Sequence, residues 1–312
     1  MTVVTFGETA LRFAPPDGRR FETAREVELR VDGMASNAAA TASRLGGDAV
    51  WCSKVPDTPL GRRVVAELGE FGLETEVVWA DEGRQGLTFH ESAADPRADR
   101  LLQDRADTAM GTVTPADLPL DRVQDADAVF AAGSTAALSE TAADTTRTVL
   151  QSAPGIRALD LDFHPDLWDV ETARATFGDL FDAVDLLFAS EEQAKTVFDR
   201  TGSARELVHT IASEFGFSRV VLTRSERGVV GYHDNVIHEQ DAFDTDGTDA
   251  AGQHAALVGA VLERLADGAA TDEALAYGAA AAALARTMPG PLTPIEAAEV
   301  DRLVADQDDR GR

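Results

Sequence analysis

Short apolar runs alternate with helix-like segments along most of the 312-residue chain, and no other feature constrains its fold as strongly. The runs that predict β-strands are residues 3–6, 49–52, 128–132, 156–161, 184–188 and 219–223. The helix-like segments between and after them include residues 58–71, 139–152, 190–198 and 204–215. Strands joined through helices pair in parallel and carry helices on both faces of their sheet. The sequence therefore predicts an α/β fold with a doubly wound, mainly parallel sheet.

The ends of the predicted helices carry recognisable signals. Ser36 stands at the expected N-cap of a helix over residues 38–45. Thr58 and Pro59 open the next helix, and Gly72 follows its last residue. The rest of the chain is predicted to hold a hairpin of residues 229–232 and 236–239, followed by helices over residues 252–265, 272–286 and 294–304.

Two segments break the alternation of strand and helix, residues 11–31 and 86–105. Both alternate polar and apolar residues without a helical period, which is typical of half-exposed β-strands. We expect them to form antiparallel ribbons that protrude from the α/β body as a lid over the strand ends. No low-complexity linker or composition shift marks a boundary, so residues 1–312 are predicted to form a single domain with this small β lid.

The chain carries 55 acidic residues against 28 basic ones, a formal net charge of −27. A surface of that sign repels nucleic-acid phosphates and anionic lipid headgroups, so neither nucleic acid nor a membrane is expected as a partner. The acidic balance resembles that of cytosolic proteins from salt-accumulating halophiles. We therefore expect a cytoplasmic protein adapted to molar salt, where screening shortens the reach of charge repulsion.

Three further classes of protein are not expected from this sequence. Cys52 is the only cysteine, which rules out an internal disulfide and a cysteine-based zinc cluster. Residues 1–9 have neither the basic region nor the apolar core of a secretory signal. Gly7 leads into another extended run rather than into a G-x-G-x-x-G turn and a helix, which argues against a nicotinamide-dependent dehydrogenase.

Motifs spread along the whole chain resemble those of one enzyme family. They are residues 4–9, 36–37, 44–46, 59–64, 85–87, 104–106, 160, 167–168, 223–228 and 286–290. Their order and spacing resemble the ribokinase-like (pfkB) family of carbohydrate kinases, and within it the 2-keto-3-deoxygluconate kinases. The resemblance implies a ribokinase-like fold and transfer of the γ-phosphate of ATP, with Mg²⁺, to a hydroxyl of a small sugar acid or polyol. It also implies a homodimer formed through the lid.

The family's catalytic motif reads D-T-x-G-A-G-D, and the stretch from Asp249 to Ala255 stands in its place. The resemblance assigns an anion hole, made of backbone N–H groups at a helix N-terminus, to Gly252, Gln253 and His254. Ala255 occupies the position of the aspartate that accepts the proton of the sugar hydroxyl. A methyl group cannot accept a proton, so the catalytic base is absent.

The resemblance also assigns the substrate-binding residues Gly33, Asn37, Thr88, Gln103, Arg105 and His164. The first two and the arginine keep the family's residue types. The threonine and the glutamine stand where the keto-acid kinases place tyrosines that hold the substrate carboxylate. His164 stands where the family has an arginine, so most departures remove a functional group or weaken a cation.

The nucleotide side is assigned, again by resemblance, to Ser190, Thr223, Ser225, Gly228, Asp249 and Ala279. Ser190 opens an N-x-x-E motif that organises Mg²⁺ and phosphate, but Gln193 replaces its glutamate. Ser225 replaces the glycine of a K-x-G motif. The six histidines show no ligand spacing, so no metal site is expected beyond the Mg²⁺ that accompanies ATP.

Each of these positions also has an ordinary structural explanation. Residues 249–255 also read as a plain helix start, His254 as a solvated first-turn residue or a replacement base, Asn37 as part of a helical turn, and Arg105 as a surface arginine. Two functions stay open. One is an ATP-dependent sugar or sugar-acid kinase whose activity is lowered by the loss of its base. The other is a catalytically inactive paralogue that binds sugar or nucleotide, or pairs with an active kinase.

Overall fold

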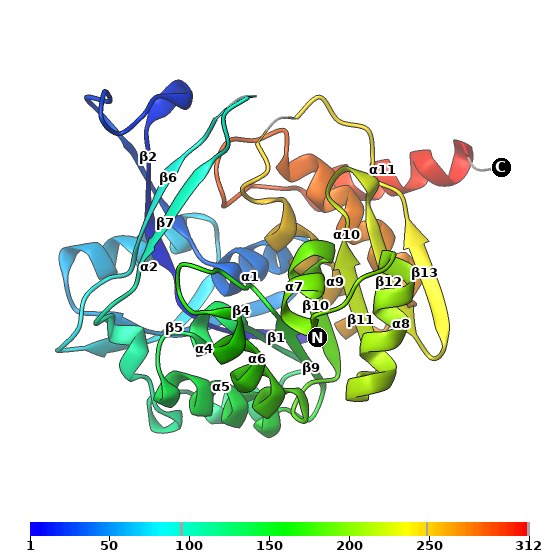
Figure 1. Ribbon diagram of the computed structural model, residues 1–312, viewed down its shortest axis with the longest axis horizontal. Helices are drawn as coiled ribbons and strands as arrows, with labels where there is room; N and C mark the ends of the chain where they lie inside the picture. The colour runs from blue at the N-terminus through cyan, green and yellow to red at the C-terminus, as the bar shows by residue number, and fades with distance from the viewer. Residues whose placement is uncertain (94–95, 248, 311–312) are drawn as a thin grey trace.

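The computed structural model describes residues 1–93, 96–247 and 249–310, and two β-sheets organise them (Figure 1). The larger sheet has nine strands in the order β13-β12-β11-β10-β9-β8-β1-β4-β5. These strands are β1 Thr2–Phe6, β4 Asp48–Pro56, β5 Glu74–Ala80, β8 Ala128–Ala132, β9 Ile156–Asp160, β10 Leu186–Ser190, β11 Arg219–Thr223, β12 Val229–His233 and β13 Val236–Gln240. All neighbours pair in parallel except β11–β12 and β12–β13. The predicted mainly parallel sheet is confirmed.

Helices cover both faces of this sheet, as the alternation of segments predicts (Figure 1). They are α1 Met34–Arg44, α2 Pro59–Glu70, α3 Leu120–Gln124, α4 Gly133–Ala136, α5 Glu140–Ser152, α6 Val170–Phe181, α7 Glu191–Phe198, α8 Ala204–Phe215, α9 Gln253–Ala266, α10 Thr271–Ala285 and α11 Ala297–Arg310. Neighbouring strand residues point to opposite faces. Val4 and Phe6 therefore pack in the core beside α5–α8, whereas Val3 packs in the core beside α1, α2, α9 and α10.

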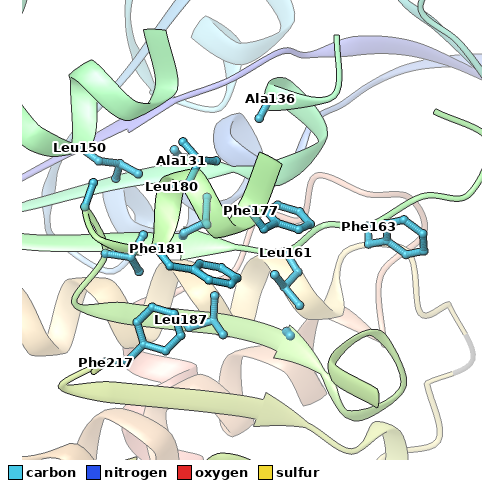
Figure 2. Close-up of a cluster of buried hydrophobic side chains, with 14 of the residues drawn as sticks. Ala131, Ala136, Leu150, Leu161, Phe163, Phe177, Leu180, Phe181, Leu187 and Phe217 are labelled. Carbon is cyan, nitrogen blue, oxygen red and sulfur yellow. The ribbon is translucent and has the colours of Figure 1, made fainter. Parts of the chain in front are cut away.

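Aromatic side chains fill much of the core beside α5–α8. Figure 2 shows Phe177 and Phe181 of α6 close to Leu161, Leu187 and Phe217. The rings of Phe181 and Phe217 meet edge to face, with their centroids 5.2 Å apart. Because protein interiors pack as densely as organic crystals, this layer gives the strand ends a rigid support.

Side-chain caps begin four of the eight predicted helices, at Thr58, Ser139, Ser190 and Ser203. Thr58 and Ser139 each accept a hydrogen bond from the backbone N–H three residues later, at 3.2 and 3.0 Å, so these two starts are confirmed. The prediction of Ser36 as an N-cap is wrong. Helix α1 begins at Met34 after the N-cap Gly33, where a side chain would collide with the chain that follows β1.

Some element boundaries differ from those predicted. β4 continues past residue 52 to Pro56 because its far half pairs with β5, an edge strand that the sequence analysis missed. The strand predicted at residues 184–188 lies at Leu186–Ser190. The last helix begins at Ala297 rather than 294 because Arg44 binds the Pro294 and Ile295 carbonyl oxygens and holds that segment as a loop.

The smaller sheet is the lid, with strands in the order β3-β2-β6-β7 (Figure 1). Its strands are β2 Ala10–Ala14, β3 Glu28–Asp32, β6 Leu87–Glu91 and β7 Arg100–Asp104. The pairs β2–β3 and β6–β7 are antiparallel as predicted, whereas the β2–β6 pair that joins them is parallel, because both hairpins start at the same end of the lid. Residues 94 and 95, between β6 and β7, lie outside the described residues. None of the described helices combines the length and the apolar character that a membrane crossing requires.

Candidate active site

One large cleft, with a volume of about 1160 Å³, lies between the lid and the carboxyl ends of the body's strands. Asp162, Ser190 and Thr223, which stand at or just after the ends of β9, β10 and β11, line it. Open α/β sheets bind their ligands at this edge. Apart from Gly252, every residue that the sequence analysis assigned to substrate, nucleotide or catalysis lines this same cleft.

Helix α9 begins inside the cleft, with Gly252 as its N-cap and Gln253, His254 and Ala255 in its first turn. The first turn of a helix leaves backbone N–H groups without intrahelical partners, and the helix dipole favours an anion there. The predicted anion hole coincides with this helix start. Gly252 also has a packing reason, because a Cβ there would lie 2.8 Å from the Pro291 carbonyl oxygen.

His254 is bonded to a buried carboxylate. Its Nε2 lies 2.5 Å from Oδ2 of the fully buried Asp160, and its Nδ1 lies 3.4 Å from Thr223 Oγ1. Burial lowers the pKa of His254, but the charge and hydrogen bond of Asp160 outweigh burial and raise that pKa above its ordinary value. Asp160 therefore favours the protonated form of His254, and both ring nitrogens of His254 already have partners.

Two predicted positions of the catalytic motif have no free carboxylate to offer. Ala255 presents only a methyl group and is nearly buried. Asp249 uses both carboxylate oxygens on the backbone, accepting hydrogen bonds from Ala251 N at 2.9 Å and from Gly290 N at 2.8 Å. Asp249 therefore holds the loop before α9 against the segment after α10, and its contact with nucleotide stays a prediction.

Asp162, which the sequence analysis did not assign, brings a carboxylate into the cleft. Its Oδ1 lies 3.0 Å from His164 Nε2, and its backbone has a positive φ of 37°. Burial raises the pKa of Asp162, but the charge and hydrogen bond of His164, together with Ser134 and His254, outweigh burial and lower it. Burial lowers the pKa of His164, but its pairing with Asp162 outweighs burial and raises it, so the pair favours the charged form of each group. The sequence analysis considered residues 160–164 only for the family residues that they lack. It therefore did not assign Asp162, whose carboxylate lines the cleft.

Gly33 and Asn37 lie at the start of α1 and line the cleft. A Cβ on Gly33 would lie 2.6 Å from the Glu8 carbonyl oxygen, so packing requires glycine there. Asn37 Nδ2 donates to Asp32 Oδ1 at 3.3 Å, while Asn37 Oδ1 is buried and has no partner among the described residues. This amide and carboxylate offer both donors and acceptors to sugar hydroxyls.

Thr88, Gln103 and Arg105 share the cleft-facing side of the lid. Arg105 uses its donors within the protein: its Nε lies 2.5 Å from Glu8 Oε2, its Nη2 donates to Thr88 Oγ1 at 2.9 Å, and its Nη1 binds the Leu87 carbonyl oxygen. Thr88 Oγ1 in turn lies 3.4 Å from Gln103 Oε1. The three predicted residues are brought together, but their polar groups are largely engaged with one another.

The predicted magnesium-side motif serves as a helix cap. Gln193 N donates to Ser190 Oγ and Ser190 N donates to Gln193 Oε1, each at 3.1 Å, in a reciprocal capping box at the start of α7. Gln193 Nε2 lies 3.4 Å from the Phe163 carbonyl oxygen. Mg²⁺ prefers carboxylate ligands, and neither residue supplies one.

The remaining residues assigned to the nucleotide side line the same cleft. For some of them the backbone conformation also explains which residue type is present. Ser225 has a φ of +55°, a conformation for which the family's glycine is better suited. Gly228 has a φ of +87°, and a Cβ there would lie 2.1 Å from the Gln240 carbonyl oxygen. Ala279 lines the cleft together with other small α10 side chains, which leaves room for a flat group. Thr223 contacts His254, as described above.

Two further cleft residues, Arg12 and His90, were also missed. Arg12 stands opposite Thr88 in the β2–β6 pairing, and His90 lies two residues after Thr88 on β6, so both share its face of the sheet. The strand periodicity that placed Thr88 in the cleft therefore predicts the same side for both residues. The motifs that carry the resemblance do not include these two positions, so the sequence analysis did not assign them.

The chain matches the model of the pfkB family carbohydrate kinases over residues 2–298. A 2-dehydro-3-deoxygalactonokinase from Haloferax volcanii is 45% identical over 305 residues, which cover 97% of this chain and 96% of that protein. A fructokinase from Escherichia coli is 25% identical over 247 residues, with 77% of this chain and 79% of that protein covered.

Solved structures share the whole fold. A 2-dehydro-3-deoxygluconokinase from Thermotoga maritima superposes with a TM-score of 0.90 at 24% identity, covering 98% of each chain. A putative ribokinase II from Escherichia coli, in complex with ATP and Mg²⁺, superposes with a TM-score of 0.86 at 18% identity and covers 98% of this chain and 99% of that one. The ribokinase-like architecture predicted from the sequence is thereby confirmed.

Proposed function

The chain belongs to the pfkB family of carbohydrate kinases, and on that premise we propose that it transfers the γ-phosphate of ATP to a hydroxyl of a 2-dehydro-3-deoxy sugar acid. The observation that carries the proposal is the match to the Haloferax volcanii kinase along nearly the whole of both chains. The cleft supports it, because the start of α9 and the polar pair Asn37 and Asp32 line the same space. A phosphate at the start of α9 and a sugar at Asn37 and Asp32 would then be neighbours.

The residues present suit nucleotide better than they suit a tightly held metal. The N-terminus of α9 and the ring of His254 would face the phosphates, and Thr223, Gly228 and Ala279 would line the nucleoside side. Mg²⁺ is usually held by one or two carboxylates together with substrate phosphates. Asp162 is the carboxylate that would hold it here, and the ion would neutralise charge on the transferring phosphoryl group.

We expect turnover to be slow because Ala255 cannot accept the proton of the sugar hydroxyl. A positioned general base accelerates such a step by about 10² to 10⁴. Nε2 of His254 is engaged with Asp160 and its Nδ1 faces Thr223, so we do not expect this side chain to replace the base.

A catalytically inactive paralogue that binds sugar or nucleotide is the second candidate. It is favoured by Ala255 together with the capping box that engages Ser190 and Gln193. Measurement of ATP turnover in molar KCl with 2-dehydro-3-deoxygalactonate, 2-dehydro-3-deoxygluconate and fructose separates the candidates. Slow, saturable turnover of a sugar acid supports the kinase, whereas sugar-acid binding with no turnover supports the inactive paralogue.

A homodimer formed through the lid is part of the same proposal. The side of the lid that faces away from the cleft carries exposed apolar side chains beside the Glu91–Arg100 pair: Phe13 stacks on Phe89, Leu102 is 57% exposed, and Val27, just before β3, is 41% exposed. Leu102→Glu should shift the protein toward monomer in light scattering, while Leu60→Glu on α2 should not. The lid and body are proposed to fold as one domain, because Leu11 is fully buried in the body's core.

A further inference from the structure

The cleft-facing side of the lid carries a cation that the family pattern does not assign. Arg12 extends from β2 into the cleft that Asn37 and Asp32 also line, beside Thr88 of the neighbouring strand. We propose that Arg12, positioned by His90, binds the carboxylate of the sugar-acid substrate and selects acids over neutral sugars. This inference rests on the function proposed above and adds to it the residue that recognises the acid group.

The donors of Arg12 are only partly used within the protein. Its Nη2 lies 2.5 Å from His90 Nδ1, and its Nη1 approaches Asp32 Oδ2 no closer than 3.8 Å, which is beyond hydrogen-bonding distance. The Nε atom is buried without a partner among the described residues. Arg12 as a whole is only 8% exposed. A guanidinium that has lost most of its water and keeps free donors gains strongly from a charge-assisted bond to a carboxylate.

His90 fixes the orientation of this guanidinium without cancelling its charge. Burial lowers the pKa of His90, and the neighbouring charge of Arg12 lowers it further, so the ring is neutral. A neutral ring that accepts a hydrogen bond at Nδ1 carries its proton on Nε2, which faces Asp99 Oδ2 at 3.5 Å. The ring therefore holds Nη2 in place and leaves the positive charge available to a ligand.

The other lid cations of the cleft are less available. Arg105 is ion-paired to Glu8 and bonded to two further oxygens, as described above. Arg30 is bonded to Glu28 and to the Pro289 carbonyl oxygen, each at 3.0 Å. Arg97 also lines the cleft without a carboxylate partner among the described residues, but it is exposed to solvent and donates to the Gly18 carbonyl oxygen. Arg12 is thus the buried lid arginine of the cleft that has no carboxylate within hydrogen-bonding distance in the described part of the chain.

Asp32 lies near enough to Arg12 to compete with a substrate carboxylate for the guanidinium. Its protonation matters for that reason. Burial raises the pKa of Asp32 above its ordinary value, despite the opposing charges of Arg12 and Arg105. Its Oδ1 already accepts the hydrogen bond from Asn37. Asp32 and Asn37 therefore suit the hydroxyl end of a polyhydroxy acid, and Arg12 suits its acid end.

The test is isothermal titration of the whole protein in molar KCl with 2-dehydro-3-deoxygalactonate and with fructose as a neutral probe. We expect Arg12→Gln to weaken binding of the acid by about 10- to 100-fold and to change fructose binding little. Arg12→Lys keeps the positive charge but loses the paired N–H donors of the guanidinium, so it should retain part of the preference for the acid over fructose. The matched control is Arg100→Gln, which removes a cation from the opposite side of the same sheet, where Arg100 faces Glu91.

Each outcome decides the question. A selective loss of acid binding in Arg12→Gln, with Arg100→Gln like the wild type, supports the inference. Unchanged acid binding in Arg12→Gln overturns it, and so does an equal loss of acid and fructose, which indicates a purely structural role. If Arg12→Gln unfolds, Arg12→Lys decides: it must lose affinity for the acid more than for fructose. If the wild-type protein binds no sugar acid, the proposed function fails and the inference with it; if it binds the acid regardless of Arg12, only the inference fails.

Discussion

The imidazole of His254 lies 2.5 Å from the buried carboxylate of Asp160, at the point where α9 meets the end of β9. The family's motif has a glycine at the position of His254, so this pair has no counterpart in the pattern on which the sequence analysis relied. Both ring nitrogens of His254 have partners, Asp160 and Thr223, so this ring leaves no free nitrogen beside Ala255. The same pair also ties the first turn of a helix to the end of a strand, so it should contribute to stability.

The His254–Asp160 pair should make stability depend on pH. The pKa of His254 is raised in the folded protein, so its contribution is complete below the unfolded histidine pKa of about 6.5 and is lost as pH rises through the folded pKa. We expect His254→Gln to destabilise the protein most at mildly acidic pH and progressively less above it. Chemical denaturation at several pH values measures this. His238→Gln, at a histidine without an ion pair among the described residues, is the control and should show no such trend.

Gly228 illustrates a glycine that the backbone requires. Its φ of +87° and the 2.1 Å approach of the Gln240 carbonyl oxygen both oppose a side chain. We expect Gly228→Ala to cost about 1–3 kcal/mol from the backbone conformation and more from the collision. Gly268 has a similar φ of +86°, but a Cβ there would meet no atom within 4 Å, so Gly268→Ala should cost only about 1–2 kcal/mol. Equal losses of unfolding free energy in the two variants would show that the collision is relieved without cost.

Nucleotide binding should be weak. The anion-binding helix start remains, but the cleft has glutamine at 193 where the family's motif has glutamate, and serine at 225 where the motif has glycine. We expect the dissociation constant of ATP, measured by calorimetry with Mg²⁺ in molar KCl, to be in the high micromolar range or weaker. Nanomolar affinity would mean that the nucleotide site is intact.

The charge of −27 should make the fold depend on salt. Self-repulsion opposes the compact state in dilute buffer, and screening near 1 M salt shortens its range to roughly 3 Å. We expect circular dichroism to report loss of structure on dialysis from molar KCl into low salt. Retention of the full signal and of the melting temperature would contradict the expected adaptation to salt.

Much of the fold could be predicted because its signals are local. The periodicity of α8 and the residues that open α2 and α5, Thr58 and Ser139, lie within short stretches of chain, and the structure has these helices where they were expected. The start of α1 could not be predicted, because it depends on contact of Gly33 with residues next to β1. The edge strand β5 was missed for a related reason: its residues are half exposed and pair only with β4.

The candidate site divides in the same way. Resemblance led to residues that line one cleft, because motif order reflects the order of strand ends and helix starts. It could not predict which polar groups are already engaged, such as Arg105 with Glu8, since that pairing joins a lid residue to the end of β1. Nor could it find the charged pair Asp162 and His164, which depends on a positive φ at the aspartate.

The central claim is that this kinase fold has a cleft weakened at several positions, of which Ala255 is the catalytic one. Ala255→Asp restores a carboxylate in the first turn of α9, a role usually worth about 10² to 10⁴ in rate. Phosphoryl transfer also depends on positioning and on neutralising the phosphates. Because Gln193, Thr88 and Gln103 would stay unchanged, the single substitution should not restore full activity.

The most direct test is the rate of 2-dehydro-3-deoxygalactonate and 2-dehydro-3-deoxygluconate phosphorylation by the wild type and Ala255→Asp, assayed side by side with ATP and Mg²⁺ in molar KCl. Ala255→Asn, which has the size but not the basicity of aspartate, is the control. The account predicts a slow or undetectable wild type and an Ala255→Asp variant that stays nearly inactive until Gln193→Glu, Thr88→Tyr and Gln103→Tyr are also introduced. Robust turnover by the wild type, or by Ala255→Asp alone, would contradict it.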